Sequence, residues 1–222
     1  MKRTRPVVAI DGPSGAGKST VARSLARALG FHYVDTGALY RSVAYLADQH
    51  GMAWDDGEKL AALAAAREFS FAEDGGLVVD GEAIGDAIRT PHISRGASKV
   101  ARLEEVRRAL LKVQRQLGAG GGVVLEGRDI GTVVFPDAEV KIFLTATAKE
   151  RARRRFLELE ARGAAVTLEQ VERDQAERDR ADSEREASPL VRAEDAFELV
   201  CDGMSVDEVV AAIAARVAAV FL

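Results

Sequence analysis

The eight residues from Gly12 to Ser19 have the types and the spacing of a phosphate-binding loop. They read GPSGAGKS and match the pattern G-x-x-x-x-G-K-[ST]. Glycines let a backbone wrap closely around phosphates, and the N-terminus of a following helix adds free N–H groups. Lys18 is expected to reach the β- and γ-phosphates of a nucleoside triphosphate, and the Ser19 hydroxyl is expected to hold Mg²⁺. The predicted donor-binding residues are Gly12, Pro13, Ser14, Gly15, Ala16, Gly17, Lys18, Ser19 and Thr20.

The loop alone leaves the class of nucleotide-binding protein open. A GTPase would need a guanine-reading Asn-Lys-x-Asp motif after its fourth strand, and residues 145–148 read Thr-Ala-Thr-Ala there. A Gly-rich turn with a chance lysine is disfavoured, because an apolar strand leads into the loop and an amphipathic helix leads out. A non-catalytic nucleotide sensor remains an alternative. Residues that could bind a second ligand would distinguish an enzyme from such a sensor.

Three further clusters of charged residues are candidates for binding a second ligand. DTGALYR (35–41) and EGRDIGT (126–132) each follow a predicted strand, and open α/β sheets place their ligands at the carboxyl ends of strands. The third cluster, ERDRADSER, lies on a charged helix. Its residues Arg178, Asp182 and Arg185 are spaced by four and three, so they share one helical face.

The strand-end loops and the charged helix all offer arginines. An arginine fork matches phosphate oxygens bidentately, so we expect these side chains to converge on one anionic ligand, with neighbouring aspartates accepting from its donors. For the helix, the alternative is a solvated surface laced with ion pairs, as on most charged helices. The residues concerned are Arg41, Arg128, Arg178 and Arg185, with Asp129 and Asp182 as acceptors.

Short apolar runs alternate with amphipathic helical patterns along most of the chain. This alternation predicts an α/β fold with a parallel sheet, whose strands are buried on both faces and therefore read as near-continuous apolar runs. Helices are expected between the loop and Gly30, around residues 39–46, over 103–117 and after Ser205. The predicted strands cover 7–10, 32–34, 123–125, 140–144 and 197–201.

Between residues 69 and 89 the pattern changes to that of hairpins. Phe69 and Phe71 alternate with polar residues, and the pairs Gly75-Gly76 and Asp80-Gly81 are typical of turns. We therefore predict a small antiparallel insert on the edge of the main domain. Elsewhere, capping boxes predict three helix starts, at Thr147 with Glu150, Thr167 with Gln170, and Ser205 with Glu208.

Composition excludes several classes of protein. With 222 residues, 47% apolar and 30% charged, the chain has the balance of a globular protein with one substantial core. A net charge of −4 argues against electrostatic binding of nucleic acid by the whole molecule. The short apolar run after the basic N-terminus predicts neither a signal peptide nor a membrane span, and the single Cys201 cannot form an internal disulfide. We expect a cytoplasmic monomer.

Taken together, these motifs resemble those of a known enzyme family. GPSGAGKST, DTGALYR, EGRDIGTVVFPDA and ERDxxDSxR…PL are similar to the motifs of bacterial cytidylate (CMP) kinases, and the resemblance covers nearly the whole chain from about Val8. It implies a P-loop fold with a five-stranded parallel sheet and helices on both faces. It also implies one kinase domain (1–222) with a monophosphate-binding insert (about 60–100) and a short helical lid (about 148–165).

The resemblance further implies that the γ-phosphoryl of ATP is transferred to CMP or dCMP, with Mg²⁺. A kinase for another small acceptor, such as UMP, AMP or a metabolite, is the alternative. Ser98, Arg107 and Asp129 resemble the family's cytosine readers. The chemistry of cytosine agrees, since it offers an amino donor beside two acceptors. The full set of implied substrate-binding residues is Thr36, Tyr40, Arg41, Ser98, Arg107, Arg128, Asp129, Arg178, Asp182 and Arg185.

By the same resemblance, the catalytic cations are Lys18, Arg128 and Arg154. The expected lid carries Arg151, Arg154 and Arg155, which the sequence does not rank, and for at least one of them an exposed basic helix is the alternative. Glu126 stands where many relatives have Asp, so its reach towards Mg²⁺ is left open.

Overall fold

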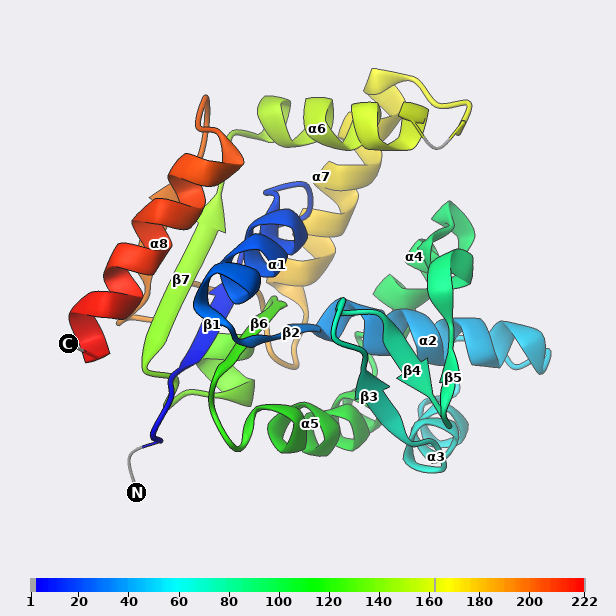
Figure 1. Ribbon diagram of the computed structural model, residues 1–222. Coiled ribbons are helices and arrows are strands. Elements are labelled where there is room, and N and C mark those ends of the chain that lie inside the picture. The colour runs from blue at the N-terminus through cyan, green and yellow to red at the C-terminus, as the bar shows by residue number, and fades with distance from the viewer. Residues whose placement is uncertain (1–2, 162, 222) are drawn as a thin grey trace.

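The computed structural model describes residues 3–161 and 163–221. Five parallel strands form one sheet in the order β2–β6–β1–β7–β8 (Figure 1). The central strand β1 pairs with β6 and β7, so that Val7 lies opposite Val123 and Val8 lies opposite Val140. The predicted parallel sheet is confirmed. Its strands are β1 (Val7–Asp11), β2 (His32–Asp35), β6 (Val123–Gly127), β7 (Val140–Thr145) and β8 (Phe197–Val200).

Side chains along β1 alternate between two buried layers, because successive residues of a strand point to opposite faces. Val8 and Ile10 pack with α1 and α8 on one face of the sheet. Val7 and Ala9 pack on the other face, with η2 and partly with α5. Helices therefore cover both faces, as predicted. These elements are α1 (Lys18–Leu29), α5 (Glu104–Gly118), the π-helical turn η2 (Ile130–Val134) and α8 (Val206–Phe221).

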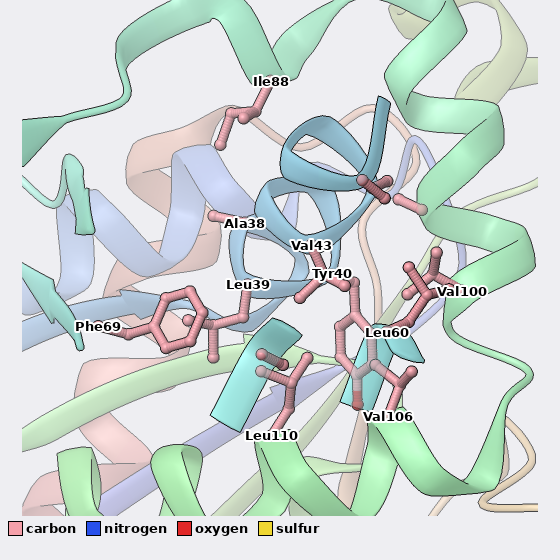
Figure 2. Packing of buried hydrophobic residues seen from close by; sticks show 14 of the residues in the cluster. Ala38, Leu39, Tyr40, Val43, Leu60, Phe69, Ile88, Val100, Val106 and Leu110 are labelled. Atoms are coloured by element: carbon pink, nitrogen blue, oxygen red, sulfur yellow. The ribbon is translucent and has the colours of Figure 1, made fainter. Parts of the chain in front are cut away.

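A third apolar cluster joins the helices after β2 to the antiparallel strands (Figure 2). Leu39 of α2, Leu60 of α3 and Leu110 of α5 are fully buried in it, and Phe69 packs at its edge. Burying a side chain of this size stabilises the fold by about 1.5–3 kcal/mol. The cluster thus holds the start of α2 in place beside the sheet. The helices are α2 (Thr36–Gln49), α3 (Gly57–Ala65) and α4 (Pro91–Val100).

Three short strands form a separate antiparallel sheet in the order β3–β4–β5. Asp80 and Gly81, between β4 and β5, have φ angles of 51° and 84°. A two-residue hairpin turn with positive φ at both positions matches the twist of the flanking strands. The hairpin chemistry predicted for this region is confirmed. The strands are β3 (Phe69–Phe71), β4 (Leu77–Val79) and β5 (Glu82–Ala83), and the 3₁₀ turn η1 (Gly85–Arg89) leads on to α4.

Helices α6 (Ala148–Ala161) and α7 (Leu168–Glu184) pack against each other on the side of the phosphate-binding loop (Figure 1). Residue 162, which falls within the range predicted for the lid, lies outside the described residues. No helix in the described part of the chain is long and apolar enough to cross a bilayer.

Two of the three predicted capping boxes form in full, at the starts of α7 and α8. The third, before α6, is only half formed. The Glu150 N–H donates to the Thr147 hydroxyl at 3.4 Å, but the Thr147 N–H donates to Asp202 at 3.0 Å. The Glu150 carboxylate accepts instead from Arg154. The box was predicted wrongly because a distant carboxylate occupies the donor that Glu150 would have capped.

Candidate active site

The register of the parallel sheet brings three predicted loops together at one edge. Asp11 of β1 lies opposite Gly127 of β6, and Asp35 of β2 lies opposite Glu126. The phosphate-binding loop, the loop that carries Arg128 and the start of α2 therefore leave the sheet side by side, at the carboxyl ends of its strands.

The phosphate-binding loop has a backbone that requires glycine. Gly15 and Gly17 have φ angles of 76° and 89°, in a region that costs other residues about 1–2 kcal/mol. At Gly12 a Cβ atom would overlap the carbonyl oxygen of Leu144 on β7. Lys18 is buried at the start of α1, and its Nζ donates to the Pro13 carbonyl at 2.7 Å. The loop is thereby closed on itself.

One cavity of 930 Å³ runs from the phosphate-binding loop to the predicted acceptor residues. This volume is at the upper end of the range for small-molecule sites, which leaves room for two ligands. Residues 14–20 line one part of it, whereas Gly12 and Pro13 are not among the described residues that line it. All ten predicted substrate-binding residues line the cavity: Thr36, Tyr40, Arg41, Ser98, Arg107, Arg128, Asp129, Arg178, Asp182 and Arg185.

Positive charges crowd this cavity. Burial, followed by repulsion from Arg128, lowers the pKa of Lys18 to about 7. The same two causes lower the pKa of Arg178 to about 10. Burial and like charge both disfavour the charged form of a basic group, and a bound anion reverses both effects. The cluster therefore has the electrostatics of an anion-binding site.

Two carboxylates orient these cations. Arg128 Nε donates to Asp182 Oδ2 at 2.8 Å, and Arg185 lies 3.8 Å from Asp182 and 3.9 Å from Asp129. Burial raises the pKa of Asp182, but Arg128 and Arg178 outweigh burial, so that this pKa is lowered. Arg178 Nε and Arg185 Nη2 are buried without a hydrogen-bond partner among the described residues. Orphaned buried donors of this kind are costly unless a bound group accepts from them.

Arg107 of α5 and Asp129 form a buried ion pair, in which Arg107 Nη2 donates to Asp129 Oδ2. Arg107 Nη1 also donates to the Ala101 carbonyl at 3.1 Å, and the guanidinium lies over the Tyr40 ring, 5.4 Å from its centroid. The pair thus offers a carboxylate acceptor beside arginine donors. Such a pair can read the edge of a planar heterocycle.

Asp35 fixes the first of the predicted phosphate-binding arginines. Its carboxylate accepts from Arg41 Nη2 at 2.6 Å, and Arg89 of η1 lies 4.0 Å away. Burial raises the pKa of Asp35, but Arg41 and Arg89 lower it by more. Next to it, the Thr36 hydroxyl donates to the Glu126 carbonyl at 2.7 Å, so the threonine ties α2 to β6.

Glu126 is buried between β2 and the phosphate-binding loop. Its carboxylate accepts from the Tyr33 hydroxyl, and the Ser19 hydroxyl lies within hydrogen-bonding reach. Burial, followed by the charge of Asp35, raises the pKa of Glu126. The Tyr33 ring is in turn covered by the turn at Gly75, where a Cβ atom would overlap it. Glu126 therefore does reach the serine of the loop.

The candidate arginines of α6 point to different places. Arg151 is buried and donates to the Ser14 carbonyl at 2.9 Å, on the outside of the phosphate-binding loop. Arg155 lines the cavity, and its charge adds to the burial and the Arg128 repulsion that lower the pKa of Arg178. The first of these arginines supports the loop, whereas the second faces the ligand space.

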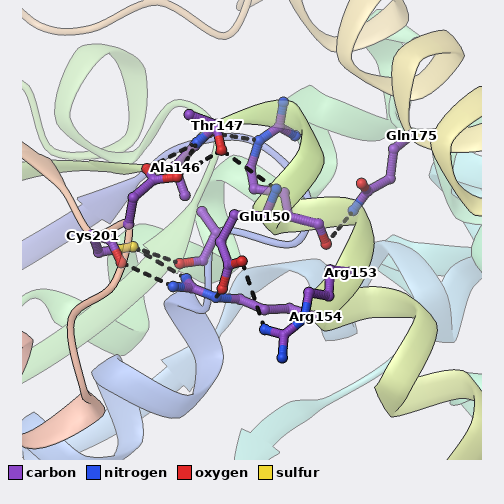
Figure 3. A network of polar contacts seen from close by, with 10 residues as sticks. Ala146, Thr147, Glu150, Arg153, Arg154, Gln175 and Cys201 are labelled. Atoms are coloured by element: carbon purple, nitrogen blue, oxygen red, sulfur yellow. Dashed lines mark hydrogen bonds and ion pairs between the residues drawn. The ribbon is translucent and has the colours of Figure 1, made fainter.

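Arg154, one of the three predicted catalytic cations, also lines the cavity. Its Nε donates to Glu150 at 2.9 Å and its Nη2 to the Cys201 carbonyl at 2.8 Å, as Figure 3 shows. Its guanidinium is near Gly17, since a Cβ atom there would lie 3.8 Å from Nη1. Arg154 thus sits at the donor end of the cavity.

The sequence model of one protein family, described as cytidylate kinase, matches residues 8–219. The chain belongs to the cytidylate kinase family. It is therefore an ATP-dependent nucleoside monophosphate kinase. A cytidylate kinase from Pelotomaculum thermopropionicum is 53% identical over 218 residues, which are 96% of this chain and 96% of the relative. A second, from Geobacter sp. (strain M21), is 50% identical and covers 91% of this chain and 88% of the relative.

Some relatives are longer than this cytidylate kinase family member. A bifunctional pantoate ligase/cytidylate kinase from Synechococcus sp. (strain RCC307) is 54% identical over 95% of this chain, which spans 42% of that protein. Among solved structures, an uncharacterized protein from Eubacterium ventriosum has a TM-score of 0.53 and 12% identity, and the match covers 96% of this chain and 99% of that one. This likeness concerns the fold alone.

The sequence did not single out Asp11, Tyr33, Arg89 or Gln175 of this kinase. Asp11 is buried at the end of β1 and accepts from the N–H groups of Ile130 and Gly131 at 2.8 and 2.7 Å. Burial raises the pKa of Asp11 to about 6. It ties the strand before the phosphate-binding loop to the loop with Arg128. The only sign of this role of Asp11 in the sequence is its position directly before Gly12. Gln175 is a polar residue in a highly charged helix, and the sequence gives no sign of its role.

Proposed function

We propose that this chain transfers the γ-phosphoryl of ATP to CMP or dCMP, giving CDP or dCDP. The observation that carries the proposal is the content of one cavity. It holds a phosphate-binding loop, orphaned buried arginine donors and the Arg107–Asp129 pair. A non-catalytic sensor needs only the first of these features.

The arginines serve as the binding site for the acceptor phosphate. Arg41 and Arg128 are held in place by Asp35 and Asp182, and Arg185, whose Nη2 has no hydrogen-bond partner among the described residues, completes the cluster. The second pKa of a phosphate monoester is about 6, so the acceptor is largely a dianionic nucleophile at neutral pH. Transfer therefore needs no general base, and catalysis consists of positioning and charge neutralisation.

Asp129 and Arg107 read the base. The Asp129 carboxylate accepts from the cytosine amino group, while Arg107 and Ser98 donate to the ring nitrogen and the carbonyl oxygen. Uracil has no amino donor, so the carboxylate disfavours it. Asp182, which accepts from Arg128, contacts the sugar.

Mg²⁺ fits the oxygen groups at the donor end. Within residues 3–161 and 163–221, no cluster of three or more His, Cys, Asp or Glu could hold a metal ion by itself. Mg²⁺ needs few protein ligands beside phosphates and water, and the Ser19 hydroxyl next to the Glu126 carboxylate supplies oxygens of the right kind. The Ser19 hydroxyl would bind the ion, and the Glu126 carboxylate would bind water molecules of its hydration shell. Bound there, the ion would neutralise charge on the donor phosphates.

Lys18, Arg128 and Arg154 stabilise the charge that develops on the transferred group. Removing one such cation is expected to cost about 3–4 kcal/mol in the transition state. We assign residues 60–100 to a monophosphate-binding insert and 148–165 to a lid whose closure excludes water. Monomeric state and cytoplasmic location stay predictions from the sequence.

A coupled assay of ADP release with CMP, dCMP, UMP and AMP tests the proposal, with Lys18→Met as the background. CMP and dCMP should raise turnover well above UMP, and AMP should raise it least. If UMP or AMP surpassed CMP, the assignment of Asp129 and Arg107 to the base would fail. If no acceptor raised ADP release above the ATP-only rate, the assignment of this transfer would be lost.

A further inference from the structure

The Ser14 carbonyl, within the phosphate-binding loop, is held from outside the loop. Arg151 Nη1 donates to it at 2.9 Å and Gln175 Nε2 at 3.4 Å. Arg151 comes from the first turns of α6 and Gln175 from the middle of α7, and both side chains are buried. In the described part of the chain, neither of them lines the cavity. Two helices thus grip one backbone group of the loop on the face away from the ligand space.

The gripping side chains are themselves held. Arg151 Nη1 lies 2.6 Å from Asp179 Oδ2, and its Nε donates to the Ala146 carbonyl at 3.0 Å. Gln175 Nε2 also donates to the Arg151 carbonyl at 3.4 Å, and Figure 3 shows this amide turned towards α6. The guanidinium therefore has one orientation, fixed by a carboxylate of α7 and by the backbone before α6.

Fixing the Ser14 carbonyl also fixes the direction of the Gly15 N–H. A peptide unit is planar and trans, so the Ser14 carbonyl and the Gly15 N–H point in opposite directions. With the carbonyl held by α6 and α7, the Gly15 N–H faces away from them, towards the cavity that Ser14 and Gly15 line. The loop also packs closely against both helices, because a Cβ atom on Gly15 would lie 2.8 Å from the Arg151 carbonyl oxygen and would overlap Gln175 Nε2.

We propose that Arg151 and Gln175 are positioning residues that hold the Ser14–Gly15 peptide so that its N–H faces the donor phosphates. Unlike Arg154 and Arg155, Arg151 then acts through the loop and not by contact with ligand charge. The inference rests on the proposed role of the loop as the ATP site. It makes the packing of α6 on α7 a condition for donor binding.

The test compares Arg151→Met and Gln175→Met with Arg173→Met, a control on α7 whose exposed arginine pairs only with nearby Glu169 among the contacts described. The first readout is ADP binding by calorimetry, and the second is KM for ATP against KM for CMP. We expect Arg151→Met to weaken ADP binding by about tenfold or more and Gln175→Met by a few-fold, as loss of a buried hydrogen bond implies. KM for ATP should rise in step, KM for CMP should stay within about twofold, and the control should bind ADP like the wild type.

Arg151→Lys keeps a donor near Ser14 and should recover part of the lost ADP affinity, which a purely structural role would not predict. If Arg151→Met does not fold, Gln175→Met decides, because it removes no charge and little volume. ADP affinity equal to that of the wild type in a folded variant would overturn the inference, as would an equal rise in both KM values. By contrast, a wild type that binds ADP without CMP-dependent turnover would overturn the proposed function alone.

Discussion

Replacing Lys18 by methionine should abolish phosphoryl transfer and, at the same time, make the protein alone more stable at neutral pH. Loss of transfer follows from the loss of a cation at the donor phosphates. The gain in stability follows from burial, because the folded chain encloses the Lys18 ammonium beside Arg128 without a carboxylate bonded to it in the described contacts. Methionine fills a similar volume and carries no charge.

The magnitude follows from the pKa of Lys18, which falls from 10.5 to about 7 on folding. At pH 7 this corresponds to a cost on the order of 4 kcal/mol, since one pKa unit is about 1.4 kcal/mol. The substitution also removes the hydrogen bond to the Pro13 carbonyl, which offsets about 1 kcal/mol. A net gain of about 3 kcal/mol would raise Tm by roughly 6–12 °C in a domain of this size.

The lowered pKa of Lys18 determines the sign of the pH dependence of wild-type stability. Between about pH 7 and 10.5 the unfolded chain binds a proton at Lys18 that the folded chain has released, so wild-type stability rises with pH in this window. The advantage of Lys18→Met should therefore be complete below about pH 7 and vanish towards pH 10.5. Calorimetric unfolding without nucleotide at pH 6.5, 8 and 9.5 measures it.

Lys141 is a matched control, because it is also buried but donates to the Pro136 carbonyl at 2.6 Å and to Asp195 at 2.8 Å. Lys141→Met should lower stability by about 1–2 kcal/mol, as loss of satisfied hydrogen bonds implies. Equal destabilisation by both substitutions, or a Lys18→Met difference that does not change with pH, would refute the reasoning.

Two further predictions concern acceptor choice and the loop backbone. Asp129→Asn replaces a carboxylate acceptor beside Arg107 by an amide that is partly a donor. The ratio of kcat/KM for CMP to kcat/KM for UMP should therefore fall by about tenfold or more, equivalent to ~1–3 kcal/mol. An unchanged ratio would rule out base reading by this carboxylate. Gly12→Ala should destabilise the fold by more than about 3 kcal/mol, because its Cβ atom would strike the Leu144 carbonyl, whereas Gly30→Ala, with a φ of 60° and open space around it, should cost about 1 kcal/mol. Urea unfolding of both variants checks this, and similar losses in the two would contradict the steric explanation.

Sequence patterns predicted the parts of the site that depend on residues adjacent in the chain or on the regular pairing of parallel strands. The phosphate-binding loop was recognisable because its glycines, Lys18 and the following helix start are adjacent in the chain. The strand-end clusters were predictable because parallel strands bring their carboxyl ends to one edge, and the register of Asp11 with Gly127 confirms that arrangement. Arg178 of α7 and Arg185, directly after the helix, line the same cavity, as their spacing indicated.

The remainder depends on packing that the sequence does not encode locally. Arg151, Arg154 and Arg155 have the same chemistry within five residues, and only the contact of α6 with α7 decides that the first supports the loop. The capping box expected at Thr147 is only half formed for a similar reason, since Asp202, 55 residues away, accepts from the Thr147 N–H. Gln175 shows its role only when the Ser14 carbonyl is seen beside it.

The strand that carries the phosphate-binding loop comes first in the chain among the five parallel strands, yet it lies in the centre of the finished sheet. Its partners are Val123 and its neighbours on one side and Val140 and its neighbours on the other, so β1 stays unpaired until more than 110 further residues, up to β6, have been synthesised. Pairings between segments so far apart form slowly and leave apolar edges exposed in the meantime. A nascent chain stopped before β6 would carry an intact loop motif without a sheet to shape it. Nucleotide therefore has no formed site by which to assist the early stages of folding.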